Sequence, residues 1–330
     1  MNGRIDRTQP ITIAVLAAGM LFSIGAAAQP ISYPTKPVRI IVTSGPGVVT
    51  DLNARLVAGK LSTMWGQPVV VENKVGGNAI IGTDAMVKAA PDGHTLLLTT
   101  TGIVQNPATR LKDLPYDTER DVAPVTQMFI VRIMYAVDAK LPANTIGEFL
   151  GLAKANPGKF NFGSYGTGST AHLLATKLNR DANVDIVHVP FNGPAPAVRA
   201  LLAGDVSSVM SEVATLRPHV TAGKARYLAT TGGKRSAHAP DVPTFAEAGV
   251  SGFAVDSWAG LFAPGATPDR ILNKISSDVA AVMVMPDVRA WYHDATIEPA
   301  SNTPAEFKAI IKRDIDYWRS LVTSTGMKVD

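Results

Sequence analysis

The sequence predicts an α/β protein with two lobes, each built on a parallel sheet whose strands are separated by helices. Short apolar runs of strand length alternate with stretches in which apolar residues recur at helical spacing. This alternation restarts in the second half of the chain. Two of the strand-like runs also break into glycine-rich turns that open straight into a helix. Short strands separated by helices require right-handed crossovers, so each half is expected to form an open parallel sheet.

The elements of the first half follow from its apolar spacing. The strand-like runs are residues 38–43, 69–71 and 95–99. A helix is expected from Thr50 or Asp51, because apolar residues then recur at helical spacing as far as Trp65. A second helix is expected over residues 80–90, where a Pro-Asp-Gly turn ends it.

The second half begins with a strand-like run over residues 130–137. Thr145 and Glu148 then form a capping-box pattern at the start of a helix. Helices are also expected from Thr170 and from about Pro196. The strands expected between them cover residues 161–163, 186–189, 206–210 and 225–229.

The last third is expected to be mostly helical. Thr267-Pro268-Asp269 places a proline in a first helical turn and an acid at the positive end of the helix. Thr303 and Glu306 form a second capping box, followed by an apolar stripe. These helices are assigned to the first lobe, so the chain crosses twice between lobes. The expected lobes are residues 29–134 plus 253–330, and residues 135–252.

The N-terminus has the pattern of a secretory signal peptide. Arg4 and Arg7 supply the positive charge, residues 11–24 are apolar, and Ala26-Ala27-Ala28 offers a cleavage site. The apolar stretch is short for a membrane span. We therefore expect residues 1–28 to be removed and the protein to be exported to the periplasm, with a retained anchor as the alternative.

Composition narrows the functional classes. The 330 residues are 46% hydrophobic and 18% charged, which is ordinary for a globular protein. The net charge of +4 is scattered, and no Lys/Arg cluster predicts a nucleic-acid partner. The chain has no cysteine, which excludes disulfides, thiol catalysis, thiolate metal sites and a lipid-modified cysteine.

The two glycine-rich turns predict an anion site. The first is Ser44-Gly45-Pro46-Gly47, and the second runs from Ser164 to Ser169. Such a junction leaves free backbone N–H groups at the positive end of a helix. Open α/β sheets bind ligands beyond the carboxyl ends of their strands, where this chain also carries Thr99 to Gly102 and Asn192-Gly193. These hydroxyl and amide donors suit a carboxylate; the alternative is that they are only surface turns.

Three enzymatic or metal-binding alternatives have weaker support. Gly166-x-Gly168 matches a dinucleotide-binding turn, but no acid ends the next strand, so an exported dinucleotide-dependent oxidoreductase is the second hypothesis. A serine hydrolase would need the pattern Gly-x-Ser-x-Gly at a strand-to-helix turn. Ser164 lies between Gly163 and Gly166, so one glycine is displaced by one position from that pattern. The histidines show no metal-ligand spacing, so neither a metal nor a cofactor is expected. They are His94, His172, His188, His219, His238 and His293.

Several segments together resemble the Bug family of periplasmic solute-binding receptors, which serve tripartite tricarboxylate transporters. The similarity spans about residues 33–328. The segments that carry it are Tyr33-Pro34-x-Lys36-Pro37-Val38, Gly66-Gln67-Pro68, Pro91-Asp92-Gly93, Pro240-Asp241-Val242-Pro243-Thr244, Ala263-Pro264 and Pro286-Asp287-Val288-Arg289.

The resemblance implies a type II periplasmic-binding fold, in which two α/β lobes close on a small carboxylate without catalysis. It also implies membrane permease subunits as partners. Asp51 is expected to cap its helix rather than touch the ligand. The residues that the resemblance and the strand ends place around the ligand are Thr43, Ser44, Gly45, Pro46, Gly47, Thr99, Thr100, Gly102, Ser164, Tyr165, Gly166, Gly168, Ser169, Thr170, His172, Asn192, Gly193 and Ala195.

The chain departs from the family pattern at two places. Val48 stands where the first loop usually has a second glycine, which is expected to restrict the backbone or narrow the pocket. Ser211 stands at a family aspartate position, with Glu212 beside it. An aspartate there would face an amino group or a second polar end of the ligand, so the change argues against an amino-acid ligand unless Glu212 takes that place.

Overall fold

The computed structural model describes residues 32–109 and 114–325, together with residues 1 and 3, and the chain forms two sheets within them. The predicted signal peptide, residues 1–28, therefore lies almost wholly outside the described residues. The first sheet has the spatial order β11-β4-β10-β3-β1-β2. Its strands are β1 (Val38–Val42), β2 (Val69–Asn73), β3 (Thr95–Thr100), β4 (Val122–Val131), β10 (Ser257–Pro264) and β11 (Glu298–Pro299).

The second sheet has the spatial order β7-β6-β8-β5-β9. Its strands are β5 (Ile133–Asp138), β6 (Phe160–Ser164), β7 (Ile186–Pro190), β8 (Ser208–Glu212) and β9 (Ala225–Thr230). The strands β4, β5, β9 and β10 stand at the two places where the chain passes between the sheets. The two-lobe α/β fold is thus confirmed.

Neither sheet is purely parallel, which corrects the expectation from the sequence. β1 pairs in parallel with β2 and β3, and β6 pairs in parallel with β7 and β8. By contrast, β10 runs antiparallel to β3 and β4, and β5 runs antiparallel to β8 and β9. β5 and β10 are the strands by which the chain enters the other sheet, and each arrives there without a helical crossover to turn it round.

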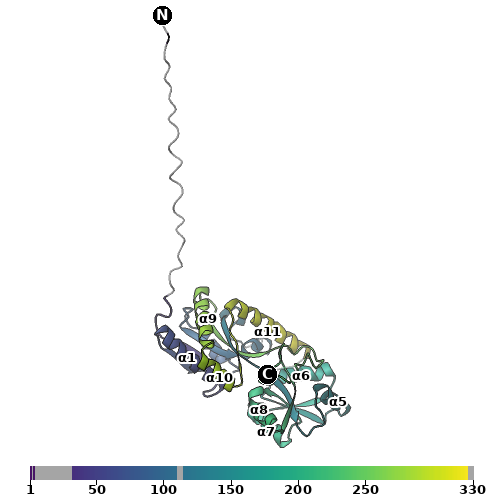
Figure 1. Ribbon diagram of the computed structural model, residues 1–330. Helices are drawn as coiled ribbons and strands as arrows, with labels where there is room; N and C mark the ends of the chain where they lie inside the picture. Colours follow the sequence, from purple (N-terminus) through teal and green to yellow (C-terminus); the bar gives the residue numbers. More distant parts are fainter. Residues whose placement is uncertain (2, 4–31, 110–113, 326–330) are drawn as a thin grey trace. The chain divides into compact units, whose positions relative to one another are not determined.

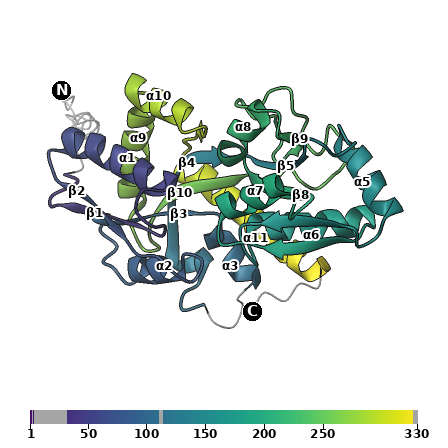
Figure 2. The ribbon, with the colours of Figure 1, turned by 90° about the horizontal axis from the view of Figure 1, so that it is seen from below.

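The helices cover both faces of the first sheet. Figure 2 shows α1, α9 and α10 on one side of it and α2, α3 and α11 on the other. The helices of this half are α1 (Val49–Trp65), α2 (Ile80–Val87), α3 (Gly102–Thr109), α4 (Thr118–Asp121), α9 (Asp269–Met283), α10 (Pro286–Asp294) and α11 (Pro304–Thr325). α11 packs on β4 and α3 and also contacts α6 of the second half, so its apolar stripe serves both.

The helices around the second sheet are α5 (Ile146–Ala155), α6 (Thr170–Ala182), α7 (Pro194–Ala203) and α8 (Val213–Thr221) (Figure 1). The capping signals read from the sequence act as expected. Thr145 Oγ1 accepts the backbone N–H of Glu148 at 3.1 Å, before α5. Before α11, the backbone N–H of Thr303 donates to the carboxylate of Glu306 at 2.8 Å, and Thr303 Oγ1 accepts in return at 3.3 Å. Local hydrogen bonds therefore set these helix starts.

The run over residues 130–137 is two strands rather than one. β4 ends at Val131 in the first sheet and β5 begins at Ile133 in the second, with Arg132 between them. The Arg132 side chain forms ion pairs with Asp256 and Glu298, so it is held at the junction instead of continuing the strand alternation. A charged residue inside an apolar run was the available signal.

The strand β10 was missed because it carries no alternating pattern. It lies between β3 and β4, and seven of its eight residues are buried. A strand buried on both faces reads as a continuous apolar run, which periodicity alone does not distinguish from a buried helix. Among the described residues, no helix has the length and apolar character needed to cross a bilayer.

Candidate ligand-binding site

A cleft of about 320 Å³ is lined by residues from both halves of the chain. The first half contributes the ends of β3, β4 and the start of β10, and the second half contributes the turn after β6 and the end of β8. The predicted site residues that line it are Thr100, Gly102, Tyr165, Gly166, Gly168, Ser169, Thr170 and Glu212. The structure therefore gathers the β3 end, the second glycine-rich turn and the β8 end around one space.

Four helices begin at this cleft. Lining residues include Val49 and Thr50 of α1, Gly102 of α3, Thr170 of α6 and Ala214 of α8. A helix start carries backbone N–H groups that have no partner within the helix, together with the positive end of the helix dipole. No Lys or Arg is among the described residues that line the cleft, and Glu212 is the single charged side chain there. Backbone and hydroxyl donors thus make this space favourable for an anion.

The first glycine-rich loop lies next to the cleft but does not line it. Thr43, Ser44, Gly45, Pro46 and Gly47 are all absent from the lining, where Val49 and Thr50 stand instead. Thr43 Oγ1 and Thr99 Oγ1 share a buried hydrogen bond of 2.8 Å. The loop is therefore tied to the end of β3 by its first hydroxyl.

Asp51 holds the same loop in place. Its carboxylate accepts the backbone N–H of Gly47 at 2.9 Å and the Asn73 side chain at 2.8 Å, and it pairs with Arg55 at 2.9 Å. The N–H of Gly47 is thus already occupied within the protein. Val48 has an ordinary φ of −81° and is 47% exposed outside the cleft, so its substitution does not narrow this space.

The second turn has a glycine backbone and an internal hydrogen bond. Gly166 and Gly168 have φ values of 133° and 75°, which non-glycine residues rarely adopt. The N–H of Gly168 donates to His172 Nδ1 at 3.0 Å, and Ser169 Oγ caps α6 through the N–H of His172 at 3.3 Å. His172 therefore supports the turn and does not line the cleft. Gly168 lines the cleft, but its N–H group is already bonded to His172, so its role is to allow the backbone conformation of the turn.

Other predicted residues fall away from the cleft lining. Asn192, Gly193 and Ala195 lie at the start of α7, and no residue of this helix start lines the cleft. Thr99 and Ser211 are buried within their strands, whereas Glu212, one residue further along β8, lines the cleft. Successive side chains of a strand point to opposite faces of the sheet. This alternation explains why Glu212 lines the cleft and Ser211 does not.

Several lining residues were not predicted from the sequence, and Gln105 is the most informative. Its Nε2 donates to Thr170 Oγ1 at 2.7 Å, which joins α3 of the first half to the start of α6 across the cleft. Both residues are buried, and they are 65 positions apart in the chain. Trp258 also lines the cleft, and its Nε1 donates to Asp314 at 2.8 Å. A polar glutamine in an otherwise apolar helix start was the available signal.

Comparison with known proteins places this architecture in a family. A model described as "Tripartite tricarboxylate transporter family receptor" matches residues 53–327. The chain belongs to this receptor family. The Bug-family resemblance is therefore confirmed: the protein BugT of Bordetella pertussis is 31% identical over 323 residues, which are 97% of this chain and 99% of that protein.

Solved structures of similar receptors carry bound carboxylates. Rpa4515 of R. palustris, solved with adipate, is 29% identical with a TM-score of 0.76, over 90% of this chain and 99% of that one. MatC (Rpa3494) of Rhodopseudomonas palustris, with bound malate, is 29% identical with a TM-score of 0.73, over 88% of this chain and 100% of that one. A structure named as the periplasmic binding protein BugD has a TM-score of 0.73. The type II periplasmic-binding architecture is thereby confirmed.

The receptor contains a buried serine–histidine pair. Ser164 Oγ lies 2.7 Å from Nε2 of His188. Ser164 is fully buried, and His188 stacks between Phe162 and His172. Burial and the adjacent His172 lower the pKa of His188 to about 4. A buried serine beside a weakly basic imidazole has no access for a substrate, so this pair packs beneath the turn.

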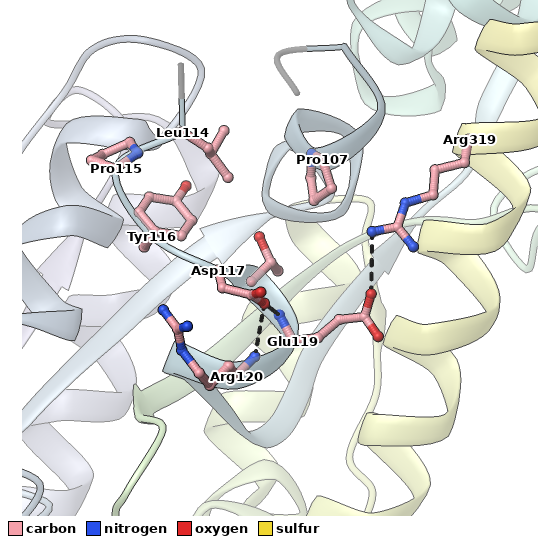
Figure 3. A pocket seen from close by; sticks show the side chains of 9 residues that line it. Pro107, Leu114, Pro115, Tyr116, Asp117, Glu119, Arg120 and Arg319 are labelled. Atoms are coloured by element: carbon pink, nitrogen blue, oxygen red, sulfur yellow. Dashed lines mark hydrogen bonds and ion pairs between the residues drawn. The ribbon is translucent and has the colours of Figure 1, made fainter. Parts of the chain in front are cut away.

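A larger hollow of about 760 Å³ lies elsewhere in the receptor (Figure 3). It is bordered by residues 114–120, including the start of the short helix α4, and by Arg319 of α11, which pairs with Glu119 at 3.2 Å. Asp117 already accepts the N–H groups of Glu119 and Arg120 there. None of the predicted site residues is among the residues that line the hollow. We therefore take the smaller cleft as the site.

Replacing Asp51 with asparagine is expected to lower the free energy of unfolding by about 2 kcal/mol at pH 7. The Arg55 guanidinium, together with the hydrogen bonds from Gly47 and Asn73, holds the pKa of Asp51 at about 2, below its ordinary 3.8. A lowered carboxyl pKa adds stability above the ordinary value, and this stability is lost as the pH falls toward the lowered one. Urea denaturation at pH 7 and pH 3 measures the difference, which should shrink at pH 3.

The exposed Asp241 offers a control for this substitution. Asp241→Asn should leave the urea midpoint unchanged at both pH values. Equal effects of the two substitutions would contradict the role of Asp51 in holding the loop.

Proposed function

We propose that this receptor captures a small organic carboxylate in the cleft between its two lobes and delivers it to a tripartite tricarboxylate-type membrane transporter. The observation that carries the proposal is the convergence of four helix starts on a cleft that has no basic side chain among its described lining residues. The relatives solved with adipate and malate support the same ligand class.

The strength of binding is accounted for without a cationic side chain. A hydrogen bond from an N–H or O–H group to a charged carboxylate contributes about 1.5–3 kcal/mol, and each helix dipole about 0.3–1 kcal/mol more. Four or five such contacts reach the roughly 8 kcal/mol of a micromolar complex after ordering costs. No catalytic group is needed for this role, and we propose that the receptor is not an enzyme.

We further propose that the receptor works in the periplasm. The signal-peptide pattern at the N-terminus supports export, and the family supports membrane permease subunits as the partners that receive the ligand. Closure would follow from the ligand contacting both lobes, which stabilises the closed arrangement over the open one.

A thermal-shift panel tests the proposed ligand class. At least one compound in a series of mono-, di- and tricarboxylates should raise the melting temperature of the purified mature protein, because a ligand that binds only the folded state stabilises it. NAD, NADP and FAD serve as comparison ligands. Stabilisation by a dinucleotide alone would contradict the proposal and favour an oxidoreductase that uses the Gly166-x-Gly168 turn.

A further inference from the structure

Glu212 carries a carboxylate that has no partner in the protein. It is the last residue of β8 and the N-cap of α8, and its side chain makes no capping hydrogen bond. It lines the cleft, and no hydrogen bond or ion pair to its carboxylate is formed by the residues that the structure describes. The acid is therefore available to a molecule that enters the cleft.

No cationic side chain compensates the charge of Glu212 among the described residues of the cleft. The lining contains no basic side chain among the described residues, and burial raises the pKa of the Glu212 carboxyl. Tyr165 is a neighbour whose pKa is raised by burial and further by the Glu212 carboxyl, so its phenol stays neutral. Glu212 is half-buried, so its carboxylate is only partly hydrated, and a ligand that supplies an N–H donor favours the ionised form and offsets the cost of desolvation.

Glu212 also makes the four helix starts around the cleft unequal. It lies at the start of α8, where its negative charge offsets the positive end of that helix dipole. The lining residues that belong to the starts of α1, α3 and α6 include no acid among those that the structure describes. A ligand carboxylate is therefore favoured at these three helix starts and repelled at the fourth.

We propose that Glu212 is a specificity-determining residue that selects monocarboxylates bearing a nitrogen donor, an amide or an ammonium, at the end opposite the carboxylate. The inference rests on the proposed function, because it names the kind of carboxylate that the same cleft takes. In the bound state the ligand carboxylate faces the starts of α1, α3 and α6, and its N–H groups donate to the Glu212 carboxylate. A dicarboxylate of the same length places a second negative charge against Glu212 and binds more weakly.

Matched ligand pairs test this polarity. Each diacid is paired in turn with compounds that differ from it only at one end. Succinate is paired with succinamate and with 4-aminobutanoate, adipate with adipamate and with 6-aminohexanoate, and terephthalate with 4-carbamoylbenzoate. Isothermal titration calorimetry at pH 7.5 compares the wild type with Glu212→Gln, which keeps the size of the side chain and removes its charge. The wild type should bind the nitrogen-bearing member of the pair that fits at least about tenfold more tightly than the diacid.

The variant should reduce this preference about tenfold or reverse it, because the diacid loses its repulsion and the ammonium ligand loses its charge partner. Asp205→Asn is the matched control: it removes an exposed charge of the second half, outside the cleft, and should keep the wild-type preference. The melting temperature of each variant confirms that it is folded.

Three results would overturn the inference, and they separate it from the proposed function. If the wild type prefers the diacid, or if Glu212→Gln leaves the preference unchanged, Glu212 does not select the ligand while the carboxylate receptor stands. If the wild type binds no member of any pair and none of the carboxylates of the thermal-shift panel, the proposed function fails and the inference fails with it.

Discussion

Replacing Arg132 with methionine is expected to lower the free energy of unfolding by about 3–5 kcal/mol, the cost of breaking a buried ion pair. Arg132 is 6% exposed and lies between β4 and β5, where the chain first passes from one sheet to the other. Its guanidinium pairs with Asp256 and, at 3.3 Å, with Glu298. Without it, two carboxylates remain close together with no cation between them.

The position of the partners explains why one arginine matters for both lobes. Asp256 directly precedes β10, where the chain returns to the first sheet, and Glu298 lies in β11 at the edge of that sheet. The Arg132 backbone carbonyl also accepts the N–H of Val213 at 3.2 Å, at the start of α8. The ion-pair cluster thus ties together the two chain crossings.

Urea denaturation measures the effect of Arg132→Met as a fall in the midpoint concentration. Arg235→Met is the matched control, because the Arg235–Glu247 pair is about half exposed and surface pairs contribute little. An Arg132→Met protein with the wild-type midpoint would contradict a stabilising role for the cluster.

The same variant has a predictable pH dependence. Burial raises the pKa of Asp256 above its ordinary 3.8, and Arg132 counteracts this effect. Removing Arg132 raises the pKa of Asp256 further. An acid whose pKa is raised on folding destabilises the folded state as the pH rises through the raised value. The deficit of Arg132→Met should therefore be largest at neutral pH and shrink on acidification toward the ordinary carboxyl range.

Gly168→Val is expected to weaken carboxylate binding by about 10- to 100-fold while leaving the protein folded. Gly168 has a φ of 75° and lines the cleft, and its N–H is held by His172. A β-branched residue in this conformation costs about 1–3 kcal/mol. This strain displaces the backbone of the turn from the conformation that lines the cleft, so the complex is destabilised. Each 1.4 kcal/mol lost from the complex lowers the affinity tenfold.

Calorimetry with a carboxylate identified by the thermal-shift panel measures this loss. Gly204→Val is the matched control, since Gly204 ends α7 with a φ of 83° and no atom lies within 4 Å of an added Cβ. It imposes a similar backbone strain outside the cleft, so it should lower stability and keep the affinity. Gly168→Asn should fall between the wild type and Gly168→Val, because asparagine tolerates positive φ better. Unchanged affinity in Gly168→Val would remove this turn from the site.

The local features of this receptor were readable from its sequence. The strand–helix alternation, the capping boxes at Thr145 and Thr303, the helix start at Thr170 and the glycines of the second turn all depend on neighbours a few positions away. Such interactions can be predicted from consecutive residues, because a helix-capping hydrogen bond and the positive φ of a glycine require no partner from a distant part of the chain. Together with the family segments, they were sufficient to predict a two-lobe binding fold and the second turn as part of a site.

The membership of the cleft depended on contacts that only the tertiary structure brings about. Gln105 meets Thr170 across the cleft, and Arg132 meets Asp256 and Glu298 from positions more than 120 residues away. The first glycine-rich loop was expected around the ligand, yet Asp51 and Thr99 hold it beside the cleft while Val49 and Thr50 line it. The sequence by itself determined which turns and helix starts exist. Which of them line the same cleft was decided by packing between segments that are far apart in the chain. No local sequence pattern encodes how such segments are oriented relative to one another.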